Sequence, residues 1–208
     1  AHVPFSRFSS FRNGRCAGDG LLNLAYETMF NAIKNISSDY ADIENAKKMA
    51  LYSQAAAVIA SKAGVDGMVG GQSLDVYLTD KPMDKEQLDY IFRLKTGALI
   101  EAAFMAGGIL AGCDEKTQGL LCKAGYNVGF AFQIKDDILD VTSTQEVLGK
   151  PVLSDERNNK TTYVTLYGLE KAEKDTYDMS KEAMGIIKSI GHNEYLEELI
   201  NMLIHRNK

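Results

Sequence analysis

Apolar side chains recur with a helical period along most of the chain. Between Gly20 and Ile36 they lie three or four residues apart, which predicts a helix with one buried face. The range from Asp39 to Ala63 shows the same period with many alanines, which favours close packing between helices. The stretch from Gly64 to Gly67 interrupts this pattern, and we expect another helix to follow it through Leu78.

Helix-start signals divide the second half of the chain. Asp84 follows Pro82 and precedes a long apolar period, so we predict an N-cap and a helix from Lys85 to about Ala111. Asp114 caps the next predicted helix, which ends near Asp140. The later predicted helices are Thr162–Tyr167, Leu169–Ile190 and Glu194–His205. Strand signals are weak throughout, so the pattern predicts an all-α protein.

Two segments lack a helical period. The polar stretch from Thr142 to Asn159 is the longest of them, and we interpret it as a functional loop. Residues 1–17 mix bulky aromatic residues with arginines, and we expect an atypical N-terminal segment that is disordered or loosely attached. The sequence shows no linker or internal repeat after it, so we predict one helical domain over residues 18–208.

Composition narrows the function classes. The 208 residues are 45% hydrophobic and 25% charged, which is ordinary for a soluble globular protein. The net charge of -5 does not support nucleic-acid binding, which favours basic surfaces. The three cysteines form an odd and sparse set that suits a reducing compartment, so we expect a cytoplasmic protein. The longest apolar stretch, from Gly97 to Cys113, contains Glu101 and predicts a buried helix rather than a membrane span.

Three aspartates close one of the predicted helices. Asp136 and Asp140 lie one turn apart on the same helix face, and Asp137 is offset from them. Acids this close repel one another unless a cation neutralises them, and Mg²⁺ is typically held by a few carboxylates together with substrate phosphates. The alternative is a solvated acidic helix end. Apolar neighbours argue against it, so the pattern favours a Mg²⁺-diphosphate site.

Six segments, taken in order, resemble the trans-isoprenyl diphosphate synthases of the polyprenyl synthetase family, which include farnesyl and geranylgeranyl diphosphate synthases. They are residues 17–22 (AGDGLL), 70–75 (GGQSLD), 93–99 (RLKTGAL), 132–140 (FQIKDDILD), 149–150 (GK) and 158–163 (NNKTTY). The resemblance implies an isoprenoid-synthase helical bundle, Mg²⁺ as cofactor and a homodimer. It also implies a prenyltransferase that condenses isopentenyl diphosphate with an allylic diphosphate.

The resemblance also implies roles for single residues. Asp136 would be the main metal ligand, supported by Asp137 and Asp140 directly or through water. The lysines that would contact the allylic diphosphate are Lys95, Lys150 and Lys160. Thr96 and Gln133 would turn oxygen dipoles toward the carbocation, and the remaining substrate-binding candidates are Gln72 and Phe132.

Each of these residues also has an ordinary structural interpretation. A single lysine is usually a solvated surface residue, although Lys95 lies in a mainly apolar helix. The Thr96 hydroxyl could bond back to its own helix, and Phe132 could be part of the core. Gln72 and Asp75 lie one turn apart and could either line a cavity or cap a helix.

The sequence departs from the family pattern at its start. The family carries a first Asp-rich motif with paired arginines and an N-terminal Gly-Lys-Arg motif, and neither precedes Ala17 in these residues. We therefore expect an N-terminally incomplete bundle with impaired prenyl transfer, arising from an altered reading frame, a truncation or a deletion. Apolar faces left uncovered would then cause poor solubility or tight association.

Three other functions compete with an active prenyltransferase. The first is a non-catalytic regulatory or truncated homologue that binds Mg²⁺-diphosphate, alone or with a complete homologous subunit. The second is a class I terpene cyclase, which the intact aspartate motif from Asp136 to Asp140 argues against. The third is a helical interaction protein, which six motifs in family order make improbable. Product length and starter substrate cannot be read from the sequence.

Overall fold

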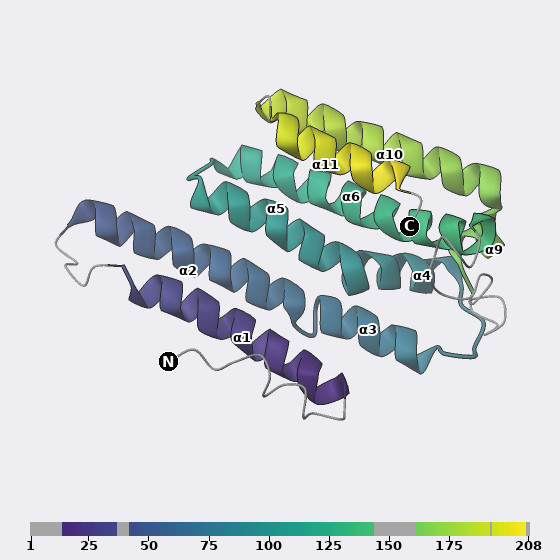
Figure 1. Ribbon diagram of the computed structural model, residues 1–208, viewed down its shortest axis with the longest axis horizontal. Helices are drawn as coiled ribbons and strands as arrows, with labels where there is room; N and C mark the ends of the chain where they lie inside the picture. Colours follow the sequence, from purple (N-terminus) through teal and green to yellow (C-terminus); the bar gives the residue numbers. More distant parts are fainter. Residues whose placement is uncertain (1–13, 37–41, 144–160, 192, 207–208) are drawn as a thin grey trace. The chain divides into compact units, whose positions relative to one another are not determined.

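The computed structural model describes residues 14–36, 42–143, 161–191 and 193–206, and every regular element in these ranges is helical (Figure 1). This confirms the all-α prediction. The chain divides into two compact units, Ala1–Ala56 and Ala57–Lys208, with one helix running across the boundary. The second unit carries the candidate site.

The helices follow the predicted order. They are α1 (Gly14–Lys34), α2 (Ile43–Ala63), α3 (Met68–Tyr77), α4 (Lys85–Ile91), η2 (Phe92–Gly97), α5 (Ala98–Leu110), α6 (Glu115–Thr142), α9 (Tyr163–Tyr167), α10 (Leu169–Ile190) and α11 (Glu194–His205). Helix α1 begins six residues before the predicted start, inside the segment expected to be atypical. Residues 1–13 of the segment expected to be disordered fall outside the described residues. The loop expected at Thr142–Asn159 does so from residue 144 onward, and α6 includes Thr142.

Both predicted N-caps are present. The Asp84 carboxylate accepts the backbone N–H of Gln87 at 2.9 Å, and the Gln87 side chain accepts the backbone N–H of Asp84 at 3.1 Å. The Asp114 carboxylate accepts the backbone N–H of Thr117 at 2.8 Å. Such caps satisfy N–H groups that have no partner within the helix and stabilise a helix by about 1 kcal/mol each.

The predicted long helix from Lys85 to Ala111 is interrupted, which corrects that prediction. Residues Phe92–Gly97 form a π-helical segment, η2, between α4 and α5. A π segment inserts extra residues into a helical turn and often marks a functional site. Because η2 packs against both α3 and α6, tertiary contacts rather than local residue preferences favour it here.

Helix α6 forms the centre of the second unit. It packs against α10 on one side and α5 on the other, and α11 contacts both α6 and α10 (Figure 1). Gly125 allows the close approach of α6 to α5, and Gly129 allows its close approach to η2. A Cβ atom at Gly125 would lie 2.8 Å from the Cα of Glu101, and one at Gly129 would lie 2.7 Å from the Cα of Gly97.

The core of this unit has two clusters. One surrounds aromatic rings of η2, α6 and α9, with centroids 5.6 Å apart for Phe92 and Phe130 and 6.2 Å apart for Phe130 and Tyr163. The other joins α6, α10 and α11 and includes Ile187 and Ile200. Together they hold η2, α9, α10 and α11 against α6, which positions the aspartate motif near the C-terminal end of α6.

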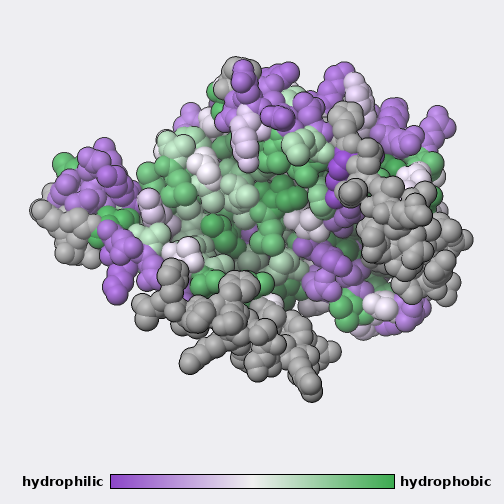
Figure 2. All heavy atoms as spheres, viewed as in Figure 1, coloured by the Kyte–Doolittle hydropathy of each residue, from purple (hydrophilic) through white to green (hydrophobic). Residues whose placement is uncertain are grey.

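Apolar side chains also reach the surface. Hydrophobic residues gather in the middle of the view in Figure 2, and the exposed side chains of α5 include Leu99 and Leu110. The predicted tight association through apolar faces stays a prediction. Among the helices in the described ranges, none combines the length and the hydropathy needed to cross a membrane.

Candidate functional site

A cavity of about 540 Å³ lies between α3 and η2. Its polar wall contains Gln72, Lys95 and Thr96, three residues that the sequence pattern singled out. The rest of the lining is Met68, Val69, Ser73 and Val76 from α3. These α3 positions fall on one helix face, so the cavity has an apolar side next to a polar one.

Gly71 allows α3 to approach η2 closely enough to form this cavity wall. A Cβ atom at Gly71 would lie 2.3 Å from the backbone nitrogen of Lys95 and 2.8 Å from the carbonyl carbon of Leu94. Both are backbone atoms and cannot rotate away. Gly71 therefore permits the close contact between α3 and η2.

Asp75 holds the Lys95 side chain at the cavity wall. The two charged groups lie 2.6 Å apart, and the side chains are 32% exposed for Lys95 and 14% for Asp75. Of the two α3 residues that could line a cavity or cap a helix, Gln72 lines the cavity and Asp75 forms an ion pair with Lys95. The Lys95 ammonium group is oriented and still partly open to solvent.

The three aspartates of α6 lie in different surroundings. The Asp136 side chain is 44% exposed, whereas Asp137 and Asp140 are 9% and 2% exposed as whole residues. Asp137 accepts a hydrogen bond from the backbone N–H of Tyr163 at 2.6 Å. Among the described residues, no three His, Cys, Asp or Glu side chains gather as a metal site. Asp136 is thus the most accessible carboxylate of the motif.

Arg206 lies directly over this accessible carboxylate. Its guanidinium group forms an ion pair with Asp136 and donates a hydrogen bond to the carbonyl oxygen of Phe132 at 3.0 Å. The same group stacks 3.7 Å from the centroid of the Phe132 ring. No local sequence pattern singles out Arg206, because 70 residues separate it from Asp136.

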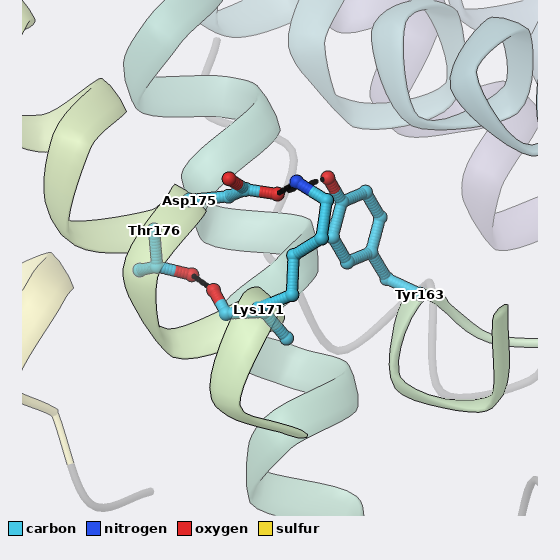
Figure 3. A network of polar contacts seen from close by, with 5 residues as sticks. Tyr163, Lys171, Asp175 and Thr176 are labelled. Carbon is cyan, nitrogen blue, oxygen red and sulfur yellow. Dashed lines mark hydrogen bonds and ion pairs between the residues drawn. The ribbon is translucent and has the colours of Figure 1, made fainter. Parts of the chain in front are cut away.

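A polar network joins α9 to α10. The Tyr163 hydroxyl donates to Asp175 at 2.6 Å, and the Lys171 ammonium group lies 2.5 Å from the same carboxylate oxygen (Figure 3). Thr176 donates to the carbonyl oxygen of Ala172 at 2.8 Å. Burial and the bond to Asp175 raise the pKa of Tyr163 well above its usual value. Burial opposes ionisation of Asp175, but the bonds from Lys171 and Tyr163 outweigh it and lower its pKa.

Removing the Tyr163 hydroxyl will weaken this network. We expect Tyr163→Phe to lower the free energy of unfolding at pH 7 by about 1–2 kcal/mol, because a hydrogen bond to a charged group is lost. The pKa of Asp175 is lowered in the folded state, so its stabilising contribution is present above the ordinary value of 3.8 and is lost as pH falls through the folded value.

The variant should raise the pKa of Asp175 and shift acid unfolding to higher pH. Carboxyl-resolved NMR titration and acid unfolding followed by circular dichroism would measure the two effects. Tyr177→Phe is the control, since Tyr177 is exposed on the same helix as Asp175. An unchanged Asp175 pKa in Tyr163→Phe would contradict the prediction.

The remaining site candidates fall into two groups. Gln133 and Phe132 are half-buried on α6, one turn before Asp137 and Asp136 respectively. Lys150 and Lys160 lie outside the described residues. The structure thus gathers Gln72, Lys95 and Thr96 in one cavity, and it gathers Phe132 and Asp136 under Arg206. The segment η2, which carries Lys95 and Thr96, contacts α6 as well as α3.

Residues 16–203 match the family model described as "Polyprenyl synthetase". Among curated relatives, the chain is 35% identical to the farnesyl diphosphate synthase of Escherichia coli over 100% of its own length and 66% of that protein. It is 37% identical to the farnesyl diphosphate synthase of Micrococcus luteus over 92% and 62% of the two chains. The chain therefore spans about two thirds or less of the relatives it matches.

Solved structures give the same result. A geranyltransferase from Helicobacter pylori, complexed with magnesium and isoprenyl diphosphate, matches 90% of this chain and 57% of its own, with a TM-score of 0.70 and 29% identity. A geranyltransferase from Legionella pneumophila matches 91% of this chain and 58% of its own, with a TM-score of 0.69 and 28% identity. This fold and the family match confirm the resemblance found in the sequence, and the chain belongs to the polyprenyl synthetase family.

Proposed function

We propose that this chain binds an allylic diphosphate with Mg²⁺ and supplies the part of a trans-prenyltransferase site that holds this substrate. The observation that carries the proposal is the cavity in which the polar side chains of Gln72, Lys95 and Thr96 lie beside apolar side chains of α3. An allylic diphosphate has the same two parts, a charged head and an apolar tail. Condensation with isopentenyl diphosphate is the reaction that the related synthases suggest.

The residues present fit Mg²⁺ in one particular way. Mg²⁺ prefers oxygen ligands, keeps several waters and is usually bound by one or two carboxylates plus substrate phosphates. Asp136 provides an accessible carboxylate, while Asp137 and Asp140 are buried. We therefore propose that Asp136 holds the ion together with diphosphate oxygens, and that Asp140 supports it. When bound, the ion neutralises charge that builds up on the departing diphosphate.

The chain's own side chains would do the rest. Lys95, oriented by Asp75, would stabilise the negative charge of the leaving diphosphate without transferring a proton. Thr96 and Gln133 would offer neutral oxygens to the allylic cation, and neutral oxygens are weaker nucleophiles than carboxylates. The apolar α3 side chains would contact the hydrocarbon part of the allylic substrate. Phe132, Lys150 and Lys160 stay proposed substrate contacts, and a cytoplasmic homodimer stays a prediction.

Binding of inorganic pyrophosphate in the presence of Mg²⁺ tests this proposal by isothermal titration calorimetry. We expect Asp136→Asn to weaken binding at least about tenfold, because an amide replaces the charged metal ligand. Lys95→Gln should weaken it as well. Asp178→Asn, at an exposed position on α10, is the matched control and should bind like the parent chain. Binding that is indifferent to Asp136 and Lys95 would refute the proposed site.

A turnover assay separates catalysis from binding alone. The chain is incubated with Mg²⁺, isopentenyl diphosphate and a short allylic diphosphate, and longer prenyl diphosphates are quantified. Product that disappears in Asp136→Asn would support prenyl transfer by these residues. Pyrophosphate binding without product would favour the second candidate, a homologue that binds Mg²⁺-diphosphate without catalysis.

Arg206 should oppose binding of the metal ion when no diphosphate is present. Its guanidinium group already contacts the Asp136 carboxylate, so a cation must displace or share that contact. We expect Arg206→Gln to raise the affinity for Mg²⁺ alone by about two- to fivefold, since a partly exposed ion pair contributes about 0.2–1 kcal/mol. Lys188→Gln, which breaks a distant 3.6 Å pair with Glu197, is the control. Equal or weaker metal affinity in Arg206→Gln would contradict this competition.

A further inference from the structure

Asp136 and Asp137 are neighbours in the sequence but have opposite environments. The Asp136 side chain is 44% exposed, whereas Asp137 is 9% exposed and accepts the backbone N–H of Tyr163 at 2.6 Å. A buried carboxylate that accepts a short backbone hydrogen bond has a fixed orientation. We propose that Asp137 is a positioning residue that fixes the start of α9 against the metal-binding segment of α6. The inference rests on the proposed function only in taking Asp136 as the metal ligand.

Tyr163 is a suitable anchor for such a contact. It is the first residue of α9, so its N–H has no acceptor within that helix and Asp137 supplies one. The preceding residue, Thr162, forms a capping box with Thr165. One residue earlier, the Thr161 hydroxyl accepts the backbone N–H of Met83 at 3.2 Å. The segment from Thr161 to Tyr163 is therefore bonded both to α6 and to the residues before α4.

The side chain of Tyr163 extends the connection to α10. Its ring packs against Phe92 and Phe130, with centroids 6.3 and 6.2 Å away, and its hydroxyl donates to Asp175 (Figure 3). A continuous set of contacts thus runs from Asp137 through Tyr163 to α10. Loss of the Asp137 carboxylate would remove the bond that holds the first N–H of α9 to α6, and it would loosen the helical turn on which Asp136 lies.

Two substitutions at Asp137 distinguish positioning from metal binding. Asp137→Asn keeps an oxygen that can accept the Tyr163 N–H, whereas Asp137→Ala removes it. A positioning role predicts that Asn retains Mg²⁺-dependent pyrophosphate affinity within about threefold and Ala loses about tenfold. A ligand role predicts that Asn loses as much as Ala, and as much as Asp136→Asn.

Hydrogen exchange at the Tyr163 amide provides a readout that does not depend on metal. Protection of this amide should fall in Asp137→Ala, be retained in Asp137→Asn and be unchanged in the control Asp136→Asn. Unaltered exchange in Asp137→Ala would overturn the inference. If Asp137→Ala does not fold by circular dichroism, the Asn variant decides, because lost pyrophosphate affinity there would overturn the inference and retained affinity would support it.

The two proposals can fail separately in this experiment. Absence of pyrophosphate binding by the parent chain would refute the proposed function. In that case the exchange measurement still decides whether Asp137 holds Tyr163, since it needs no metal and no diphosphate.

Discussion

Replacing Gly129 by alanine is expected to destabilise the second unit and to disturb the candidate site together. The new Cβ atom would lie 2.7 Å from the Cα of Gly97. Neither atom can move away by rotation of a side chain, because each is fixed by the backbone of its helix. Overpacking of this kind typically costs about 1–3 kcal/mol. For a chain of this length, that corresponds to a melting temperature lower by roughly 2–12 °C.

The position of Gly97 gives this substitution its effect on the site. Gly97 is the last residue of η2, the segment that carries Lys95 and Thr96. If α6 and η2 are forced apart, the polar wall of the α3–η2 cavity moves with η2. We therefore expect Gly129→Ala to weaken Mg²⁺-dependent pyrophosphate binding at a temperature where the variant is still folded.

Gly119 provides a matched control on the same helix. It is exposed on α6, and a Cβ atom there would meet nothing within 4 Å. Alanine is favoured over glycine inside a helix by about 0.5–1 kcal/mol, so Gly119→Ala should stabilise slightly. Both variants replace a glycine of α6 by alanine, so the change in helix preference is the same in each. The difference between their melting temperatures, measured by thermal unfolding, therefore reports the steric contact at Gly129. Equal melting temperatures for both would show that α6 and η2 can separate without cost.

Much of the fold was predictable because its signals are local. Apolar periodicity predicted the helices. Asp84 and Asp114 cap the helices that begin at the next residue, and they were predictable because capping depends only on nearby residues. The π segment at Phe92–Gly97 was missed. Its residues continue the helical period of the flanking helices, and contacts with α3 and α6 favour the altered turn.

The candidate site was only partly predictable, because some of its contacts join residues that lie far apart in the sequence. The resemblance selected Gln72, Lys95 and Thr96, and the structure brings these three together. It made Asp136 the main metal ligand and Asp137 a supporting one, but it did not predict that their surroundings differ. Their difference in surroundings depends on Tyr163, which lies 26 residues beyond Asp137 in the sequence, and no local pattern encodes that contact.

Replacing Lys62 by methionine is expected to cost about 3–5 kcal/mol of unfolding free energy. Lys62 forms an ion pair with Glu101, which is only 2% exposed and packs beside Gly125 on α6. Removing the ammonium group leaves a buried carboxylate without its counter-charge, and breaking a buried pair in this way is strongly destabilising. Urea unfolding followed by circular dichroism measures the loss.

The order of three variants tests this explanation against simple loss of packing. Glu101→Gln should cost less than Lys62→Met, because Lys62 is 25% exposed and can turn its charge toward solvent. Combining Lys62→Met with Glu101→Gln should recover part of the loss, since no unpaired charge stays buried. If the double variant is instead less stable than Lys62→Met by the full cost of Glu101→Gln, the two residues act independently. The Lys62–Glu101 ion pair would then contribute nothing to the free energy of unfolding.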